Sequence, residues 1–287
     1  MNSYVITTDT TCDLPDSYVK NNNLDIITLF YSMDDVIYGN DKKINPSEFY
    51  NMMRNGKMPT TMACNPEDTE QCFRKHLDAG KDILHIAFSS ALSSSYNTVA
   101  VTGRELAEEY KDRTIIVIDS KAASLGEGLM VYKAVQNREQ GMDITENAAW
   151  LEENKLHFCH QFTVDDLNHL HRGGRVSKAT AIIGTMINVK PVLHVDDEGR
   201  LISLSNVRGR KKSLNTLIDN MEKNCKGYKN DIVCISHGDC LSDAEYVRDQ
   251  IRQRLGIENF MINHICPTVG AHSGPGTLAL FFMGEKR

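Results

Sequence analysis

The fold class of this chain is decided by the stretch DILHIAFSSALSSSYNTVAVTGRELAEEYKDRTIIVIDS, Asp82–Ser120. Both ends of the stretch, 82–89 and 113–120, are short apolar runs rich in β-branched residues and predict strands. Between them, Val99 and Leu106 fall on one face of a predicted helix. A strand, a helix and a second strand in this order indicate a parallel sheet covered by helices.

The same alternation continues on either side of this stretch. The runs Tyr4–Asp9 and Leu24–Met33 predict two more strands, and residues 125–138 predict a helix. We therefore expect the first half of the chain to form a parallel sheet with helices on both faces.

The second half of the chain has a different pattern. Lys190–Val207 predicts two strands joined by a tight turn, and hence an antiparallel pair. Two amphipathic helix patterns and three strand patterns follow, the last two strands at 260–270 and 276–284. We divide the chain into residues 1–160 and 161–287, and we expect a ligand crevice between these two α/β domains.

The composition is ordinary for a soluble protein, since 41% of the 287 residues are hydrophobic and 24% are charged. The formal net charge of -6 disfavours nonspecific binding to nucleic acids and adsorption to anionic membranes. The first residues, MNSYVITTDT, lead into a predicted strand without the basic start and apolar core of a secretion signal. We therefore expect a soluble, cytoplasmic protein that binds no nucleic acid.

The cysteines raise the question of disulfides or a metal site. They are Cys12, Cys64, Cys72, Cys159, Cys225, Cys234, Cys240 and Cys266. No two of them form the C-x-x-C pair that zinc sites commonly use. Because scattered cysteines in a chain without a secretion signal are typical of reduced thiols, we expect neither disulfides nor a metal site.

A serine-rich turn follows the predicted strand that begins at Asp82. Ser93, Ser94 and Ser95 lie where a helix begins. A helix start offers unpaired backbone N–H groups and the positive end of the helix dipole, so these hydroxyls are candidates to bind a carboxylate or phosphate. N-capping of the helix is an equally good interpretation, although capping needs only one serine.

Two threonine-containing loops are further candidates. Thr60 and Thr61 follow a proline in a predicted loop, just before a helix that begins near Asn65. The stretch TDTTCDLP, Thr8–Pro15, lies at the carboxyl end of the first strand, which in open α/β sheets faces the ligand crevice. Turn formation through side-chain bonds to the backbone is the alternative for both loops, and for Thr60 and Thr61 it is the favoured one.

Two basic patches stand out in an acidic chain. They consist of Arg172, Arg175 and Lys178, and of Arg208, Arg210, Lys211 and Lys212. The second patch lies at the start of a predicted helix, where positive charge opposes the helix dipole. A solvated surface is the ordinary explanation for such charges, and recognition of an anionic group or an acidic partner is the alternative.

His272 stands in the stretch GAHSGPGTLALFF, 270–282, among three glycines and a proline. Its neighbours determine backbone conformation and do not form a periodic apolar pattern. This arrangement indicates a fixed bend that holds an imidazole in place.

Signatures of catalysis are missing from the sequence. There is no G-x-x-x-x-G-K-[ST] loop for ATP and no G-x-S-x-G nucleophile elbow. Ser236 and His237 are adjacent on a predicted strand, where neighbours point to opposite faces and are badly placed to share a proton. We therefore expect no catalytic residues in this chain.

Several short motifs, taken in order, make the chain resemble the DegV-like proteins, the fatty-acid-binding subunits of bacterial fatty acid kinases. The motifs are TDTTCDLP, SSALSSSY, VIDSKAASLGEG, RGGRVS followed by VKP, and HSGPG. They extend over nearly the whole chain. The resemblance implies a two-domain DegV-like α/β fold, with an N-terminal three-layer α/β/α domain around a parallel sheet and a C-terminal α/β domain with a mixed sheet.

The resemblance also implies a ligand and the residues that hold it. Thr61 and Ser93, with Ser94 beside them, would bind the carboxylate of a long-chain fatty acid, and His272 would join the same network. The family carries the lipid without transforming it, and a separate ATP-dependent kinase subunit phosphorylates the carboxyl group to an acyl phosphate. The fatty acid is then the bound ligand, no cofactor is needed, and transient contact with a membrane is compatible with this role.

A kinase partner gives the basic patches an interpretation. We expect Arg172, Arg175, Arg208 and Lys211 to contact the kinase subunit or the acyl-phosphate head group. This expectation is motivated by positive charge at a helix start, which has no local benefit.

Two departures from the family pattern lie beside the expected head-group site. The residues MACN follow Thr61 where the family has S-Q-P-S, and Ser94 replaces a glycine. Two other functions stay open at this point. One is an acyl hydrolase that uses Ser93 and His272, and the other is a purely regulatory or structural α/β protein.

Overall fold

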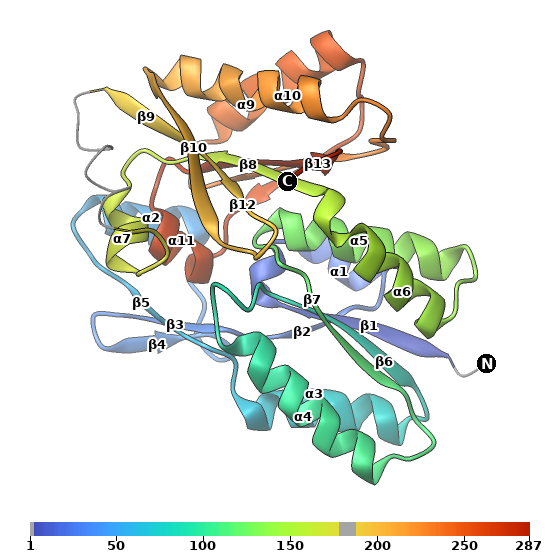
Figure 1. The fold of residues 1–287 in the computed structure, drawn as a ribbon. Coiled ribbons are helices and arrows are strands. Elements are labelled where there is room, and N and C mark those ends of the chain that lie inside the picture. The colour runs from blue at the N-terminus through green and yellow to red at the C-terminus, as the bar shows by residue number, and fades with distance from the viewer. Residues whose placement is uncertain (1–2, 178–187) are drawn as a thin grey trace.

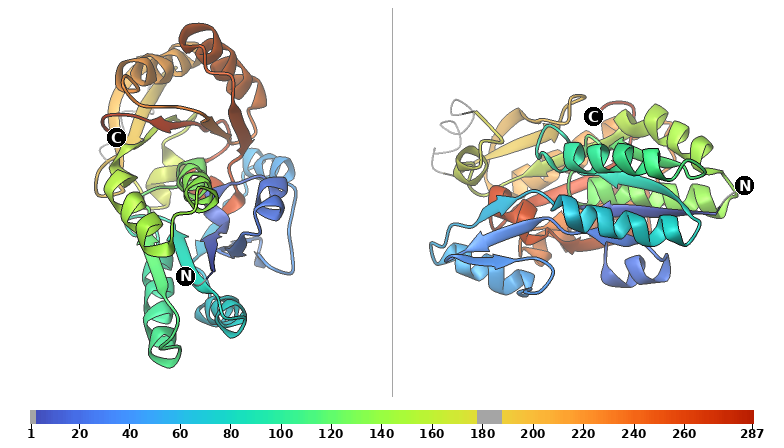
Figure 2. Two further views of the ribbon diagram at one scale, coloured as in Figure 1. Left: turned by 90° about the vertical axis from the view of Figure 1, so that its right-hand side faces the viewer. Right: turned by 90° about the horizontal axis from the view of Figure 1, so that it is seen from below.

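The computed structural model describes residues 3–177 and 188–287. In this part of the chain, three β-sheets and their helices form an N-terminal and a C-terminal half that lie against each other (Figure 1). Figure 2 shows the two halves one above the other, with helices between them. No helix in these residues combines the length and the apolar character that crossing a membrane requires.

The N-terminal half contains a sheet in which every neighbouring pair of strands is parallel. Its strands, in spatial order, are β2 (Asp25–Ile27), β1 (Tyr4–Asp9), β6 (Asp82–Ala87) and β7 (Ile115–Asp119). The strand β6 is buried along its whole length, as expected of a parallel strand that is covered on both faces.

Two pairs of helices cover this parallel sheet. The pairs are α3 (Pro66–Asp78) with α4 (Ser95–Glu109), and α5 (Leu125–Glu139) with α6 (Ile144–Asn154). Neighbouring side chains of a strand point to opposite faces, so Ile83 packs in the core beneath α3 and α4 while Leu84 packs in the core beneath α5. The three-layer α/β/α arrangement and the parallel sheet expected from the sequence are therefore confirmed.

The C-terminal half contains a mixed sheet, as expected. Its strands, in spatial order, are β10 (Leu201–Arg208), β9 (Val189–Val195), β8 (Phe158–Thr163), β13 (Leu278–Met283), β11 (Val233–His237) and β12 (Phe260–His264). Only β11 and β12 pair in parallel, and the other neighbouring pairs are antiparallel. The outer face is covered by α9 (Arg210–Asn224) and α10 (Leu241–Leu255), drawn at the top of Figure 1.

Helix α5 lies between the two sheets and belongs to the core of both halves (Figure 1). Leu129 packs in the core that includes the parallel sheet, and Gly126 faces β8 and β13. A Cβ atom at residue 126 would lie 2.2 Å from a ring carbon of His160 and 2.8 Å from Phe281. The glycine therefore permits the close approach of α5 to the mixed sheet.

The predicted strand Leu24–Met33 is wrong as a single element. Residues Asp25–Ile27 form β2 of the parallel sheet, whereas Phe30–Met33 form β3 of a separate small antiparallel sheet. The break occurs where the backbone N–H of Leu29 donates to the hydroxyl of Thr10 at 3.0 Å. The N–H of Leu29 thus bonds to a side chain and not to the neighbouring strand β1, and the chain leaves the parallel sheet at this point.

The prediction of a loop at Thr60 and Thr61 is wrong, because both residues lie in a strand of this small sheet. Its strands are β4 (Val36–Tyr38), β3 and β5 (Thr60–Met62). The strand β5 pairs antiparallel with β3 and places Thr61 opposite Tyr31. The helix expected to begin near Asn65 is α3, and the Asn65 side chain accepts from the backbone N–H of Glu67 at 2.9 Å.

The predicted strand 260–270 is correct only in its first part. The strand β12 ends at His264, and Pro267–Ser273 form the short helix α11. Pro267 occupies the first turn of α11, and the carboxylate of Asp13 accepts from the backbone N–H of Cys266 at 2.9 Å. A proline and a capping acceptor together favour a helix start over an extended strand.

The remaining elements are short. They are η1 (Thr10–Cys12), α1 (Asp16–Asn21), α2 (Pro46–Arg54), η2 (Lys155–His157) and α7 (Asn168–Arg172). The division into residues 1–160 and 161–287 stays a prediction, and the mixed sheet begins slightly before it, with β8 at Phe158.

Candidate functional site

A cavity of about 230 Å³ lies between the two halves of the protein. Its wall is mainly apolar and includes Leu29, Phe88, Leu92, Phe162, Leu201 and Phe281. Phe88 and Leu92 come from the segment after β6, and Phe162 and Phe281 come from β8 and β13 of the mixed sheet. The carboxyl end of a parallel strand is thus one wall of the cavity, as is common in open α/β sheets.

Polar side chains also line this cavity. Five of them are Thr61, Ser93, Ser94, Arg175 and His272, and the others are Ser124, His160, Thr268, Ser273 and Thr277. A second hollow of about 360 Å³ is lined by Thr60, His169, Arg172 and Gly173, and also by Thr61, Arg175 and His272. The last three residues therefore lie where the cavity and the second hollow adjoin.

Thr61 and His272 meet although 211 residues separate them in the sequence. The hydroxyl of Thr61 and Nε2 of His272 form a hydrogen bond of 2.7 Å. Thr61 is held in β5, and His272 lies in the last turn of α11, just before Gly274 ends the helix with a φ of 82°. Two short elements from opposite ends of the chain thus bring a hydroxyl and an imidazole together.

The imidazole of His272 is uncharged at neutral pH. Burial, together with the positive charge of Arg175, lowers the pKa of His272 to about 4. A neutral imidazole has one donor and one acceptor nitrogen, so it can bond Thr61 through one ring edge.

Ser93 and Ser94 lie in the turn that leads into α4. The hydroxyl of Ser93 accepts from the backbone N–H of Ser95 at 3.2 Å and lies 2.9 Å from the Ser95 hydroxyl. Ser94 occupies the N-cap position of α4, yet its side chain makes no capping hydrogen bond and is exposed at the cavity. N-capping therefore accounts for Ser93 in part but does not account for Ser94.

Arg175 joins the serine turn to the segment after α7. Its guanidinium donates to the carbonyl oxygen of Leu92 from Nε at 3.2 Å and from Nη2 at 2.9 Å, and also to the carbonyl oxygen of Gly173. Burial lowers the pKa of Arg175, but an arginine keeps its charge at neutral pH. The site therefore contains a fixed positive charge beside Ser93.

The other basic residues lie in different places. Arg172 lines the second hollow and donates to Nδ1 of His169 at 2.7 Å. Arg208 ends β10 and is exposed, and the ammonium of Lys211 lies 5.6 Å from the ring centre of Tyr246. The structure thus places Arg172 and Arg175 at the site and leaves Arg208 and Lys211 outside both linings. Lys178 of the first basic patch is outside the described residues.

The Asp–Thr–Thr cluster after β1 organises a turn. Asp9 accepts from the backbone N–H groups of Thr11 and Phe88, each at 2.9 Å, and Glu127 accepts from the hydroxyls of Thr8 and Thr11 at 2.8 and 2.9 Å. Burial raises the pKa of both carboxyl groups, and the charge of Asp9 raises that of Glu127 further. The cluster residues Thr8, Asp9 and Thr11 do not line the cavity, so the turn-forming interpretation is favoured.

Ser236 and His237 do not form a catalytic pair. Ser236 lies 2.7 Å from the hydroxyl of Ser124, while His237 accepts from the backbone N–H of Cys240 at 3.3 Å and packs against the ring of His264. The two neighbours on β11 therefore have different partners, as expected from their position on a strand.

Two residues of the site were not singled out from the sequence, although a signal was present. His169 lines the second hollow, and Gly173 packs against His272. In RGGRVS, Gly173 marks a place where a side chain does not fit, and only the structure shows that the imidazole of His272 fills that space.

The fold and the site together define an α/β protein with a mainly apolar cavity between two sheets. Hydroxyls, an imidazole and an arginine line part of that cavity. The model of the "Uncharacterised protein, DegV family" matches residues 3–285, and the chain belongs to the DegV family. A DegV domain-containing protein of Clostridium perfringens is 40% identical over 289 residues, which cover 100% of this chain and 99% of that protein.

Solved structures of the family are similar over their whole length. The structure described as "Fatty Acid Binding of a DegV family Protein from Thermus thermophilus" has a TM-score of 0.89 and 28% identity, and covers 99% of this chain and 100% of that one. A Thermotoga maritima structure described as revealing "fatty acid binding function" has a TM-score of 0.84 and 25% identity, with the same coverage.

Proposed function

We propose that this protein binds a long-chain fatty acid in the cavity between its two halves, with the carboxylate held by Thr61, Ser93 and His272 and with Ser94 beside it. The observation that carries the proposal is the hydrogen bond between Thr61 and His272 at the wall of a mainly apolar cavity. The fatty-acid binding described for the Thermus and Thermotoga relatives supports the same ligand class.

The apolar cavity and its polar groups contribute differently to binding. A buried sixteen-carbon tail contributes roughly 12 kcal/mol gross at about 0.8 kcal/mol per methylene. A charge-assisted hydrogen bond adds about 1.5–3 kcal/mol. The tail therefore supplies most of the affinity, and the polar groups fix its direction and select a carboxylate.

The negative charge of the carboxylate has two compensating partners. The guanidinium of Arg175 is tied to Leu92 directly before Ser93, and the first turn of α4 begins directly after Ser94. A helix of this length attracts an anion at its N-terminus. The site is therefore suited to an ionised head group.

We further propose that the protein is a carrier without catalytic activity or cofactor of its own, and that a separate ATP-dependent kinase subunit phosphorylates the bound carboxyl group. The second hollow has room for a phosphoryl group beside Arg172 and Arg175. Arg208 and Lys211 lie outside that hollow and would contact the kinase. Such a carrier works in the cytoplasm and meets the membrane only transiently.

A serine-dependent acyl hydrolase is the second candidate function, and the geometry favours it less. The hydroxyl of Ser93 is bonded to Ser95, and Nε2 of His272 is bonded to Thr61. Among the described residues, no hydrogen bond joins Ser93 to His272, and no carboxylate orients the imidazole. A serine nucleophile needs both of these contacts.

The ligand can be identified directly from the purified protein. Extraction of the untagged protein with organic solvent, followed by mass spectrometry, should release a fatty acid in near-stoichiometric amount. Delipidated protein should take up added fatty acid but not the matching fatty alcohol. Protein that retains no lipid and takes up none would contradict the proposal, and equal uptake of acid and alcohol would contradict the role given to the polar groups.

A further inference from the structure

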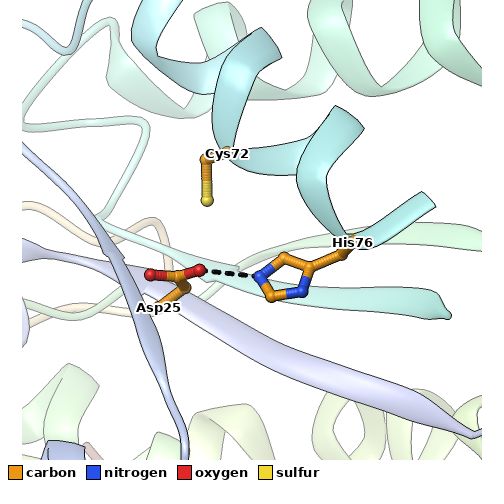
Figure 3. Close-up of side chains that lie close together, drawn as sticks. All are labelled: Asp25, Cys72 and His76. Carbon is orange, nitrogen blue, oxygen red and sulfur yellow. Dashed lines mark hydrogen bonds and ion pairs between the residues drawn. The ribbon is translucent and has the colours of Figure 1, made fainter. Parts of the chain in front are cut away.

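Asp25, Cys72 and His76 form a cluster of three metal-ligating side chains that the lipid site does not use (Figure 3). One ligand atom from each residue, a carboxylate oxygen, a sulfur and a ring nitrogen, lies within 4.8 Å of the other two. The cluster is at the edge of the parallel sheet, because β2 is the terminal strand of that sheet.

The helix spacing brings two of the three ligands together. Cys72 and His76 lie four residues apart on α3, so their side chains project from the same face of the helix. Figure 3 shows the sulfur and the imidazole both directed toward Asp25, which comes from β2. A sequence pattern C-x-x-x-H on a helix is therefore completed by a residue that lies far away in the sequence.

The present contacts are compatible with a small rearrangement around an ion. Nε2 of His76 lies 2.7 Å from Oδ2 of Asp25. Ligands of a tetrahedral zinc ion are roughly 3.3–3.7 Å apart, given metal–ligand bonds of about 2.0–2.3 Å. An ion would require the pair to open by that amount, and each of the three residues is only partly buried.

The donor set selects the kind of metal. One thiolate, one imidazole and one carboxylate are typical ligands of zinc, whereas calcium and magnesium require oxygen ligands. A groove lined by Tyr4, Asn23, Lys81 and Arg138 opens beside Asp25 and His76. Water can therefore reach the site and supply a fourth ligand.

Two features oppose an ion at this place, and both can be overcome. The ammonium of Lys75 lies 2.7 Å from Oδ2 of Asp25, but the Lys75 side chain is 67% exposed and can turn into solvent at little cost. Burial and the charge of Asp25 raise the pKa of the Cys72 thiol to about 12, so a bound metal must displace the thiol proton.

We propose that Asp25, Cys72 and His76, with one water molecule, form a zinc-binding site that links β2 to α3. The proposal departs from the expectation of no metal site, which rested on the missing C-x-x-C pair. It is independent of the lipid proposal, because none of the three residues lines the cavity.

Cobalt is a suitable probe because it replaces zinc in tetrahedral sites and absorbs light. Chelator-treated protein without an affinity tag should bind one equivalent of Co²⁺ and show a thiolate-to-cobalt charge-transfer band, which added Zn²⁺ should abolish. Zinc should also raise the Tm, since an ion that binds only the folded state stabilises it. A wild-type protein without the charge-transfer band would overturn the proposal.

Variants assign the band to particular residues. Cys72→Ser should abolish it, and Asp25→Asn should lower the cobalt affinity by more than the ~10–100-fold that loss of an outer-shell partner costs. Lys75→Met should raise the affinity, because it removes the competing ammonium. Cys225→Ser is the matched control, since Cys225 is also only partly buried but lies after α9, and it should leave the band unchanged.

The folded state of each variant is checked by its circular dichroism and its fatty-acid content. If Cys72→Ser does not fold, His76→Gln provides the second test and should lose tetrahedral binding. A band that persists in folded Cys72→Ser, or that disappears in Cys225→Ser, would overturn the assignment. Loss of metal binding with retained fatty acid would support a separate site.

Discussion

Gly173 lies so close to His272 that a Cβ atom at residue 173 would be 2.1 Å from the imidazole Nδ1. On its opposite edge the same imidazole bonds Thr61 through Nε2. The ring is therefore held between a hydroxyl and a backbone segment that has room only for a glycine. This contact connects Gly173 of the RGGRVS motif to the proposed lipid site.

Gly173→Ala should displace His272 while the protein remains folded. Gly173 has a φ of -71°, which alanine adopts without strain, so the new methyl group acts mainly on the imidazole. Loss of one hydrogen bond to a carboxylate costs about 1.5–3 kcal/mol, which weakens fatty-acid binding about 10- to 100-fold. Titration with a fluorescent fatty acid measures the change.

Gly174→Ala is the matched control for this variant. Gly174 has a φ of 73°, and a Cβ atom there would meet nothing within 4 Å. Alanine should therefore cost stability through backbone strain and leave His272 in place. If both variants weakened binding equally, the contact with His272 would not be the cause.

Thr61→Val and Ser93→Ala should each weaken fatty-acid binding about 10- to 100-fold, because each removes one hydroxyl from the carboxylate site. Both hydroxyls are partly buried at the cavity wall. Ser32→Ala is a suitable control, since the Ser32 hydroxyl bonds Thr60 on the same small sheet and does not line the cavity. Unchanged affinity in both cavity variants would refute the assignment of the head group.

The pKa of His272 should rise when the ligand binds. In the free protein its pKa is lowered to about 4, first by burial and then by the charge of Arg175. A carboxylate beside the ring favours the charged imidazole and should raise that pKa. NMR titration of the ring protons with and without fatty acid tests this, and an identical pKa in both states would place the carboxylate elsewhere.

Asp13 should make the protein less stable as the pH rises from about 4 to about 7. Burial raises the pKa of its carboxyl group to about 7, so between the unfolded and folded pKa values the folded state binds more protons. The contribution of Asp13 to stability is therefore largest below about pH 4 and is lost as the pH rises to about 7, which amounts to about 4 kcal/mol for a shift of this size.

Asp13→Asn should remove this part of the pH dependence in urea unfolding curves. The amide keeps an oxygen for the backbone N–H of Cys266, which precedes α11. Asp16→Asn changes an exposed carboxylate a few residues away and should leave the pH dependence as it was. If the stability of the Asp13→Asn variant fell with pH as steeply as that of the wild type, Asp13 would not be the source of the pH dependence.

The basic residues should separate into two groups when their charge is reversed. Arg208→Glu and Lys211→Glu should slow kinase-dependent phosphorylation and leave fatty-acid binding intact, because both residues lie outside the cavity lining. Arg175→Glu should weaken lipid binding as well, since Arg175 lines the cavity and holds the carbonyl of Leu92. Equal loss of lipid binding in all three variants would contradict the docking role.

Periodic patterns in the sequence were sufficient to predict the layers of the fold. The alternation around Asp82–Ser120 predicted the parallel sheet, and the turn within Lys190–Val207 predicted an antiparallel pair that β9 and β10 form. The errors occurred where tertiary contacts override local pattern. Thr10 takes the N–H of Leu29 and ends β2, and Asp13 takes the N–H of Cys266 and favours a helix at Pro267.

The site was only partly predictable for a related reason. Thr61, Ser93 and His272 were chosen from loop motifs and from a family resemblance, and the structure brings them to one cavity wall. The contact of Gly173 with His272 and the bond from Arg175 to Leu92 are side-chain distances that no sequence pattern encodes. The same holds for Asp25, which joins Cys72 and His76 only through the packing of β2 on α3.

A crystal structure with bound palmitate tests the proposed lipid site most directly. We expect the carboxylate within hydrogen-bonding distance of the hydroxyls of Thr61 and Ser93 and of His272, with the tail directed toward the mixed sheet. The opposite orientation is a real alternative, because His160 also lines the cavity, and its buried ring nitrogens have no hydrogen-bond partner among the described residues. A carboxylate at His160, or a fatty acid outside the cavity, would contradict the proposed site.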